Sequence, residues 1–224
     1  MKQNTCFIIL APKTDQYWAQ FNNKLSIKLK NDYLINYQIQ NIFKAYPRSN
    51  IIVIGDFTDM DLAKRKKVKY INVCFDEFMN IGGMLTEVIS GIKNQSICIF
   101  NVGLIFNISG IKDLKISKTA MISSHNKKFQ SKIGCIVKNQ NQIESIFYDL
   151  NNRLFEFLYI HSKDLEKFKQ ICNACVKKYM YLFEISNILI KHNMDINIYF
   201  TNINSVHLDH PDSLLKAKRL MNTI

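Results

Sequence analysis

Apolar and polar positions follow two alternating patterns along the first half of the chain. Apolar runs, which are typical of strands buried on both faces of a parallel sheet, lie at residues 6–10, 50–55 and 96–101, and residues 68–73 predict a further strand. Between these runs, apolar positions at helical spacing predict helices over residues 34–42, 59–67 and 84–92, the last of them opened by Gly82 and Gly83. This order of strands and helices predicts a layered α/β fold with a mainly parallel central sheet.

The pattern changes after residue 120. Strands are predicted at residues 132–138 and 142–149, and the polar turn between them favours a hairpin. The remaining segments predict helices over 165–181 and 183–192, a strand over 196–200, and a last helix over 212–221 that follows Pro211. The sequence contains no internal repeat and no Pro/Gly/Ser-rich linker, so we expect one domain over residues 1–224.

The segment before the first helix presents a lysine in a loop. Residues 25–29 alternate between apolar and polar, as a short half-buried strand would, and Asn31-Asp32 is a turn signal in which Asp32 is the expected N-cap of the helix. Lys24 therefore lies a few residues ahead of a packed helix, which makes it a candidate functional cation. The alternative is a solvated loop lysine.

Composition indicates a globular protein of a reducing compartment. Apolar residues make up 47% of the 224 residues, which is enough for a sizeable core. No apolar run reaches the roughly 18 residues of a membrane span, and the short run near the N-terminus predicts a strand rather than a signal peptide. The six cysteines lie mostly in apolar segments, which favours buried free thiols and a cytoplasmic protein. Cys172 and Cys175 fit helix packing better than a zinc site, because no second pair stands at metal-site spacing.

The net charge of +12 is spread over the chain, with one basic cluster at residues 64–69. Aromatic residues are not interleaved with this cluster, which argues against a nucleic acid partner. Heavy use of Asn, Lys and Ile is typical of AT-rich coding sequence, so a solvated basic surface is favoured. Anionic substrates such as nucleoside triphosphates or phosphorylated sugars are compatible with this charge.

Both ends of the chain carry motifs of a known enzyme family. Ile8-Ile9-Leu10-Ala11, a loop, Lys24-Leu25 and then residues 34–39 resemble the opening of the sugar-phosphate and choline-phosphate nucleotidyltransferases. That opening reads as a strand with L-A-A-G-x-G-x-R, then P-K-x-L and G-x-P-L-I-x-Y-x-I. Residues 208–217 are similar to the family's I-D-T-P-E-D-L-x-x-A. Phe183-Glu184, followed by residues 196–200, resembles the aromatic-acidic segment and strand of the choline-phosphate type.

The resemblance implies a three-layer, Rossmann-like fold of the GT-A and nucleotidyltransferase type. It also implies transfer of a nucleotidyl group from a nucleoside triphosphate, with CTP favoured, to a phosphorylated sugar or alcohol, with Mg²⁺ as cofactor. Catalysis of this kind depends on positioning and charge stabilisation. The matching residues are Lys24 as the catalytic lysine, Ala11, Lys13, Gly82 and Gly83 at the nucleotide, and Asp209 at the metal, with Glu184, His207 and His210 as further candidates.

Two positions depart from the family pattern. Residues 12–18 contain no glycine where the family wraps the triphosphate with glycine amides, although Lys13 could replace the family's arginine as a point charge. Gly103 stands where the family carries a metal-binding aspartate after the fourth strand. Removing such a ligand usually removes this activity, because the metal supplies several kcal/mol of charge stabilisation. Either the chemistry has changed or the fold has been kept for binding.

Three functions follow from these observations. The first is a nucleotidyltransferase that serves polysaccharide synthesis. The second is a nucleotide-sugar glycosyltransferase on the same layered fold, although the Asp-x-Asp motif expected after the fourth strand is missing. The third is a catalytically silent binding module in an oligomer or a larger assembly. For Asp209, capping of the last helix competes with metal binding.

Overall fold

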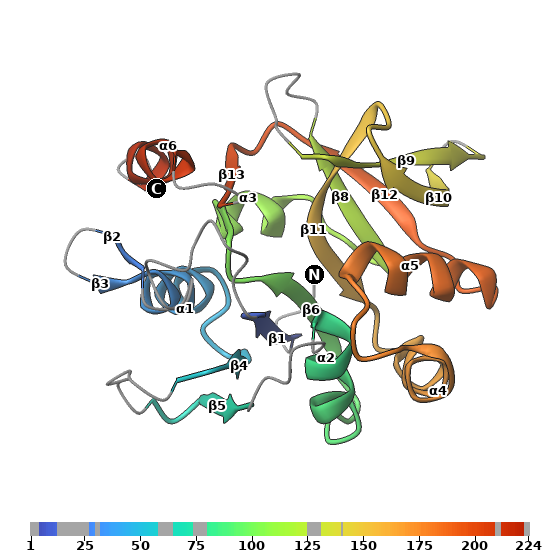
Figure 1. Ribbon diagram of the computed structural model, residues 1–224, viewed down its shortest axis with the longest axis horizontal. Coiled ribbons are helices and arrows are strands. Elements are labelled where there is room, and N and C mark those ends of the chain that lie inside the picture. Colours follow the sequence, from blue (N-terminus) through green and yellow to red (C-terminus); the bar gives the residue numbers. More distant parts are fainter. Residues whose placement is uncertain are drawn as a thin grey trace.

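A nine-stranded sheet runs through the computed structural model, which describes residues 5–12, 27–29, 32–57, 65–73, 80–124, 131–139, 141–208 and 212–221 (Figure 1). The strand order is β5-β4-β1-β6-β11-β8-β12-β10-β9. The strands of this sheet are β1 (Thr5–Leu10), β4 (Asn50–Gly55), β5 (Val68–Asn72), β6 (Ser96–Asn101), β8 (Ala120–Ser124), β9 (Ile133–Lys138), β10 (Gln142–Tyr148), β11 (Asn152–Ile160) and β12 (Asn197–Thr201).

The sheet is mainly parallel, as predicted. Strands β5, β4, β1 and β6 pair in parallel, and β8 pairs in parallel with β12. Strand β11 lies between these two groups and runs antiparallel to both β6 and β8. Strands β9 and β10 form a hairpin, in which β10 pairs with β12 and β9 pairs with β11. The five strands at this end of the sheet order, β11, β8, β12, β10 and β9, therefore form a closed ring of pairings.

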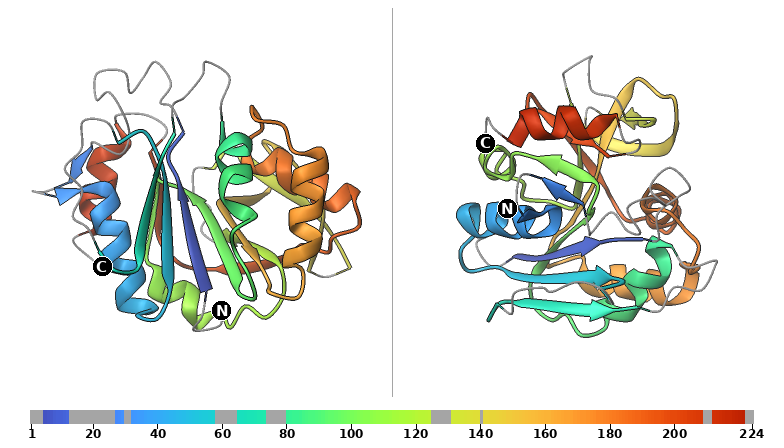
Figure 2. Two further views of the ribbon diagram at one scale, coloured as in Figure 1. Left: turned by 90° about the horizontal axis from the view of Figure 1, so that it is seen from below. Right: turned by 60° about the vertical axis from the view of Figure 1, so that its left-hand side comes forward.

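The six helices of the described ranges cover the two faces of the sheet, giving the three layers seen in Figure 2. The helices are α1 (Leu34–Ala45), α2 (Ile81–Ile89), α3 (Ile108–Asp113), α4 (Leu165–Cys175), α5 (Leu182–Lys191) and α6 (Ser213–Met221). Residues of α1, α3 and α6 share one apolar core with the sheet, and residues of α2, α4 and α5 share the other. In β1, Phe7 and Ile9 face the first core while Ile8 and Leu10 face the second, which explains why the whole strand is apolar.

Two short pairings complete the strands. The first, β2 (Lys28–Leu29) with β3 (Asp32–Tyr33), precedes α1. The second, β7 (Leu104–Phe106) with β13 (Ser205–His207), joins the chain after β6 to the chain before α6. No helix in the described part of the chain is long and apolar enough to cross a membrane.

Several helix boundaries differ from the prediction. The N-cap of α1 is Tyr33, one residue after the predicted Asp32. The carboxylate of Asp32 accepts hydrogen bonds from the Tyr33 amide (2.8 Å) and the Asn36 side chain (2.7 Å). Gly82 and Gly83 do not precede α2 but lie in its first turn, and Asn80 caps the helix by accepting from the Ile81 amide.

The predicted helix over 165–181 ends early, at Cys175, and the carbonyl groups of Lys178 and Met180 accept hydrogen bonds from the start of α2 instead. The predicted helix over 59–67 lies mostly outside the described residues, and Lys66 and Lys67 form a turn. The sequence analysis also missed β7, β8, β11, β13 and α3, of which β11 is a central strand of the sheet. The predicted free thiols are confirmed for the five described cysteines, four of which are buried.

Candidate functional site

Strands β1, β4 and β6 end at one edge of the sheet, which is where open α/β sheets bind ligands. The Ala11 amide donates to the carbonyl of Ile54 (2.9 Å), and the Val102 amide donates to the carbonyl of Leu10 (2.8 Å). These bonds extend the ladder one residue beyond β1 and fix the turn after β6 beside it. Ala11 is fully buried, so its amide serves the sheet in this structure. Its predicted role at a nucleotide remains a prediction.

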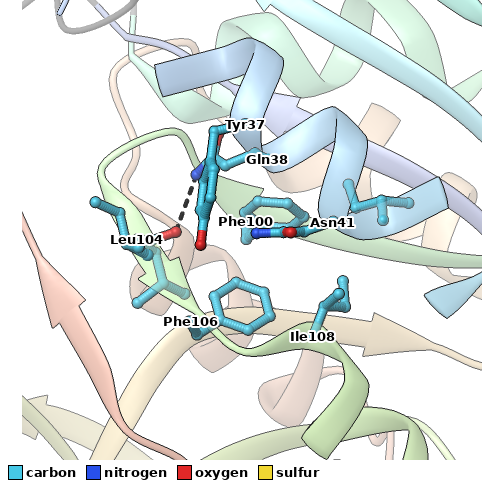
Figure 3. A pocket seen from close by; sticks show the side chains of 9 residues that line it. Tyr37, Gln38, Asn41, Phe100, Leu104, Phe106 and Ile108 are labelled. Atoms are coloured by element: carbon cyan, nitrogen blue, oxygen red, sulfur yellow. Dashed lines mark hydrogen bonds between the residues drawn. The ribbon is translucent and has the colours of Figure 1, made fainter. Parts of the chain in front are cut away.

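The side chain of Gln38 in α1 also holds the turn after β6. Its side-chain amide donates to the carbonyl groups of Val102 (2.8 Å) and Leu104 (2.9 Å), and the latter bond is drawn in Figure 3. Gln38 is buried, and its side-chain oxygen has no hydrogen-bond partner in the described part of the chain. Tyr37 and Asn41 line a small pocket with it, over Phe100 and Phe106 (Figure 3). The end of β6 is therefore held by a specific polar contact inside an apolar region.

Gly103 lies in this turn at the position of the missing aspartate. Its amide donates to Oδ1 of Asn101 (2.9 Å), and its carbonyl accepts from the Leu208 amide (2.9 Å). A Cβ atom at Gly103 would lie 3.4 Å from Asn101 Oδ1 and 3.6 Å from the Leu208 carbonyl oxygen, which is ordinary contact. None of the described glycines has a positive φ. Neither the space nor the backbone therefore requires glycine here.

Four of the predicted site residues fall outside the described residues: Lys13, Lys24, Asp209 and His210. Their roles remain predictions. The structure does describe the residue before Asp209, because the Leu208 amide binds Gly103 at the end of β6. The chain thus enters the 209–211 segment at the same edge of the sheet as the ends of β1 and β6.

Gly82 and Gly83 are packed against another part of the protein. A Cβ at Gly82 would lie only 2.1 Å from the carbonyl oxygen of Lys177, so this backbone makes the close approach that the sequence analysis assigned to a nucleotide base. The amides of Gly82 and Gly83 donate to the carbonyls of Met180 (2.9 Å) and Lys178 (3.0 Å). Packing of residues 176–180 on α2 accounts for glycine at position 82, and a nucleotide contact of either residue stays a prediction.

His207 forms a polar pair with a residue that the sequence analysis did not select. Its Nε2 lies 3.2 Å from Oε2 of Glu156 in β11, and the two side chains are 12% and 23% exposed. The register of β13 on β7 places His207 opposite Leu104, next to Gly103. A carboxylate–imidazole pair therefore lies beside the turn after β6, partly shielded from water.

Three aromatic rings gather where β10 meets α5. Phe183 contacts Tyr148 edge to face (ring centroids 5.1 Å apart) and stacks with Tyr181 (6.1 Å), and both tyrosines are about half exposed. Desolvation raises the pKa of Tyr148, and Tyr181, Glu184 and Glu156 add to the rise. Glu184 also accepts a hydrogen bond from the Tyr181 amide (2.8 Å), so it caps α5. Aromatic faces and carboxylates thus occur together near Glu156.

The described residues do not fit the Mg²⁺ site that the family resemblance implies. Such a site needs oxygen ligands, mainly carboxylates, and Gly103 supplies no side chain. Within the described ranges no group of three His, Cys, Asp or Glu side chains is close enough to hold a metal ion. The remaining predicted ligand, Asp209, lies outside those ranges.

Comparisons with known proteins decide the fold. No protein-family model and no curated protein sequence matches the chain. Solved structures match over almost the whole length. The inositol-1-phosphate CTP transferase from T. maritima matches with a TM-score of 0.78 and 15% identity, covering 99% of this chain and 96% of its own. This chain has the nucleotidyltransferase fold.

Two other neighbours of the same fold extend the comparison. UDP-glucose pyrophosphorylase in complex with UDP-glucose has a TM-score of 0.72 and 9% identity, covering 98% of this chain and 99% of its own. The CTP:phosphocholine cytidylyltransferase from Streptococcus pneumoniae has a TM-score of 0.69 and 13% identity, covering 97% and 99%. The predicted fold class is confirmed, and identities this low show the nucleotidyltransferase fold alone.

The sequence analysis missed Gln38 and Glu156. Gln38 belongs to the motif that supports the family resemblance, but nothing in the motif shows that its amide reaches another element. Glu156 is the one charged residue in the otherwise apolar run 154–160. A carboxylate inside a strand-like run is costly to bury without a partner, and this signal could have identified it.

Proposed function

We propose that the protein binds a nucleoside triphosphate, with CTP favoured, at the carboxyl ends of β1, β4 and β6, and transfers its nucleotidyl group to a phosphorylated sugar or alcohol. The observation that carries the proposal is the hydrogen bond between Leu208 and Gly103. It brings the two segments that match the family's late motif and fourth-strand motif to one edge of a sheet with the nucleotidyltransferase fold.

The acceptor is proposed to lie over the antiparallel part of the sheet. Glu156 and His207 offer a paired acceptor and donor for hydroxyl groups, and Tyr148 and Tyr181 offer exposed rings. Aromatic faces bind either the apolar faces of sugars or cationic head groups, and nearby carboxylates favour the latter. A phosphorylated amino alcohol and a sugar phosphate are therefore the two acceptor classes to compare.

Predicted residues and residues found in the structure have separate tasks in this proposal. Lys24 supplies positive charge to the reacting phosphates, as the resemblance implies. Gln38 and Asn101 hold the turn that carries Gly103, so they orient the edge without contacting substrate. Pair formation with Glu156 fixes the ring of His207 and selects its orientation toward the acceptor.

The test combines binding with turnover. Isothermal titration with CTP, UTP, ATP and GTP in the presence of Mg²⁺ measures base preference. Pyrophosphate release is then followed with phosphocholine, inositol-1-phosphate and glucose-1-phosphate as acceptors, and mass spectrometry identifies the product. We expect CTP to bind, Lys24→Ala to abolish turnover, and Glu156→Gln to raise the KM of the acceptor more than that of CTP. Failure of all four nucleotides to bind at millimolar concentration contradicts the proposal.

A catalytically silent binding module is the second candidate, and Gly103 is the observation that favours it. The missing carboxylate removes one expected metal ligand while leaving the fold of the turn intact. This candidate predicts nucleotide binding without pyrophosphate release for every acceptor. The same two measurements therefore separate the candidates.

A further inference from the structure

Cys175 differs from the other cysteines that the structure describes. Cys6, Cys98, Cys135 and Cys172 are buried, and burial raises the pKa of the Cys6, Cys135 and Cys172 thiols to about 12. Such thiols are protonated and shielded at neutral pH, so they react slowly. Cys175, the last residue of α4, is only partly buried. It is the accessible thiol among the five.

A histidine on the next helix lies against this thiol. The Sγ atom of Cys175 is 3.3 Å from Nε2 of His192, which is the C-cap residue of α5 and is exposed. An imidazole at this distance can accept the thiol proton, which is the arrangement that activates cysteine nucleophiles. Cys172 lies one helical turn earlier on α4, so the pair belongs to a cluster of two thiols and one imidazole.

The chain that follows Cys175 is docked on the start of α2. The carbonyl of Lys178 accepts hydrogen bonds from the amides of Asn80 (2.8 Å) and Gly83 (3.0 Å), and the carbonyl of Met180 accepts from Gly82 (2.9 Å). The absence of a Cβ at Gly82 gives room for Val176 and Lys177. Cys175 thus stands at the hinge between α4 and a segment held by three hydrogen bonds and close backbone packing.

We propose that Cys175 is a thiol-modification site for low-molecular-weight disulfides, and that the adduct releases residues 176–180 from the start of α2. His192 takes the thiol proton, and the Cys175 sulfur attacks one sulfur of the disulfide. A new S–S bond to Cys175 forms, the old S–S bond breaks, and the leaving thiolate takes the proton from His192. The cysteine is oxidised and the leaving half of the disulfide is reduced, so no further oxidant is needed.

The size of the adduct explains the second part of the proposal. A tripeptide thiol on the Cys175 sulfur is much larger than the cysteine side chain, and the next residue, Val176, lies close to Gly82 of α2, so the adduct is expected to displace the chain beside it. Residues 176–180 are held by hydrogen bonds to three amides and by packing of Val176 and Met180 on the core, so displacement of the segment exposes those amides to water. Faster amide hydrogen exchange at the start of α2 is then the sign that Cys175 of α4 is modified.

Labelling with glutathione disulfide tests the site. Peptide mapping by mass spectrometry separates Cys175 from Cys74, which lies outside the described residues. We expect Cys175 to react before the four buried cysteines, and His192→Gln to slow its reaction by about tenfold. His192 is exposed, so this variant is expected to fold, and circular dichroism verifies that. A Cys175 that reacts only after unfolding, or at a rate that His192→Gln leaves unchanged, overturns the assignment.

Hydrogen–deuterium exchange tests the release. In the glutathionylated protein, the peptide that contains Asn80, Gly82 and Gly83 is expected to exchange faster, while peptides from β1 and β6 stay unchanged. The same treatment of Cys175→Ser is the control, because it leaves every other thiol in place. An adduct at Cys175 without faster exchange at the start of α2 overturns the release step.

Discussion

The Leu208 amide donates a hydrogen bond to the carbonyl of Gly103, and this bond joins the segment before the last helix to the turn after β6. Oδ1 of Asn101 and the Leu208 carbonyl oxygen both lie within 3.6 Å of the position that a Cβ at Gly103 would take. Among the residues that the structure describes, this corner therefore presents two oxygen atoms and no carboxylate. Mg²⁺ prefers oxygen ligands, so a carboxylate introduced at position 103 would lie beside two further oxygens that a cation can bind.

Replacing Gly103 with aspartate is expected to create a Mg²⁺-dependent gain in stability. The backbone has no positive φ at this residue and the space is open, so Gly103→Asp is expected to fold, with a small loss of stability because its charge faces two oxygens. Saturating Mg²⁺ is expected to raise the unfolding free energy of the Gly103→Asp variant by about 1–3 kcal/mol. Thermal unfolding with and without Mg²⁺ measures this. Gly103→Asn, which has the same shape without the charge, is the control, and an equal response of both variants contradicts the argument.

The Gln38 contact predicts a large loss of stability from a single buried amide. Gln38→Ala leaves the carbonyls of Val102 and Leu104 without their donor, and a buried unsatisfied acceptor costs on the order of 1–3 kcal/mol. Urea denaturation is expected to show a loss of about 2–3 kcal/mol. Gln40→Ala, on the exposed side of the same helix, should change the free energy of unfolding by less than about 0.5 kcal/mol. Equal effects at the two positions would contradict the role of Gln38.

The buried parallel strands could be predicted from the sequence, because burial on both faces makes the whole run apolar. The predicted bounds of β4 and β6 agree with the structure, and those of β1 differ by one residue. Strand β11 was missed because Arg153 and Glu156 interrupt its apolar pattern. Glu156 is tolerated there through its contact with His207, which is a long-range pairing that local periodicity does not encode.

For the candidate site, the sequence predicts the motifs but not the contacts between segments that are far apart in the chain. Motif order along the chain identified the turn at Gly103 and the segment that begins at Leu208, and a hydrogen bond joins these two. The packing role of Gly82 could not be predicted, because a missing Cβ has the same signature whether a ligand or another backbone approaches it, and a nucleotide contact of Gly82 and Gly83 stays a prediction. At Gly82 the approaching backbone is that of Lys177, which is far away in the sequence, so local sequence patterns do not predict this contact.

This close approach makes Gly82 sensitive to the smallest substitution. A methyl group at Gly82 would lie 2.1 Å from the Lys177 carbonyl oxygen, so residues 176–180 must shift. We expect Gly82→Ala to cost about 1–3 kcal/mol of unfolding free energy by overpacking. At Gly91 the nearest atom to a Cβ is 3.7 Å away, so Gly91→Ala is the matched control and should stay within about 0.5 kcal/mol. Urea denaturation of both variants checks the contrast, and a neutral Gly82→Ala would refute the packing.

The buried thiols predict that the protein loses stability in alkaline solution. In the folded state the pKa of Cys6, Cys135 and Cys172 is about 12, raised by burial from an ordinary value of 9.0. The folded state therefore holds these protons more tightly than the unfolded state does. Their contribution is complete below pH 9 and declines as the pH rises from 9 toward 12, because only the unfolded chain releases the protons there.

Each such thiol is expected to lower the unfolding free energy by about 1.4 kcal/mol per pH unit in that window. Urea denaturation at pH 8.5, 9.5 and 10.5 measures the slope. Cys6→Ala should reduce the slope of unfolding free energy against pH by the contribution of one thiol. Any loss of packing in this variant changes the unfolding free energy at pH 8.5 but not the slope, because the slope depends only on the number of protons released on unfolding. A stability that stays flat to pH 10.5 would show that these thiols ionise as easily in the folded protein as in the unfolded chain.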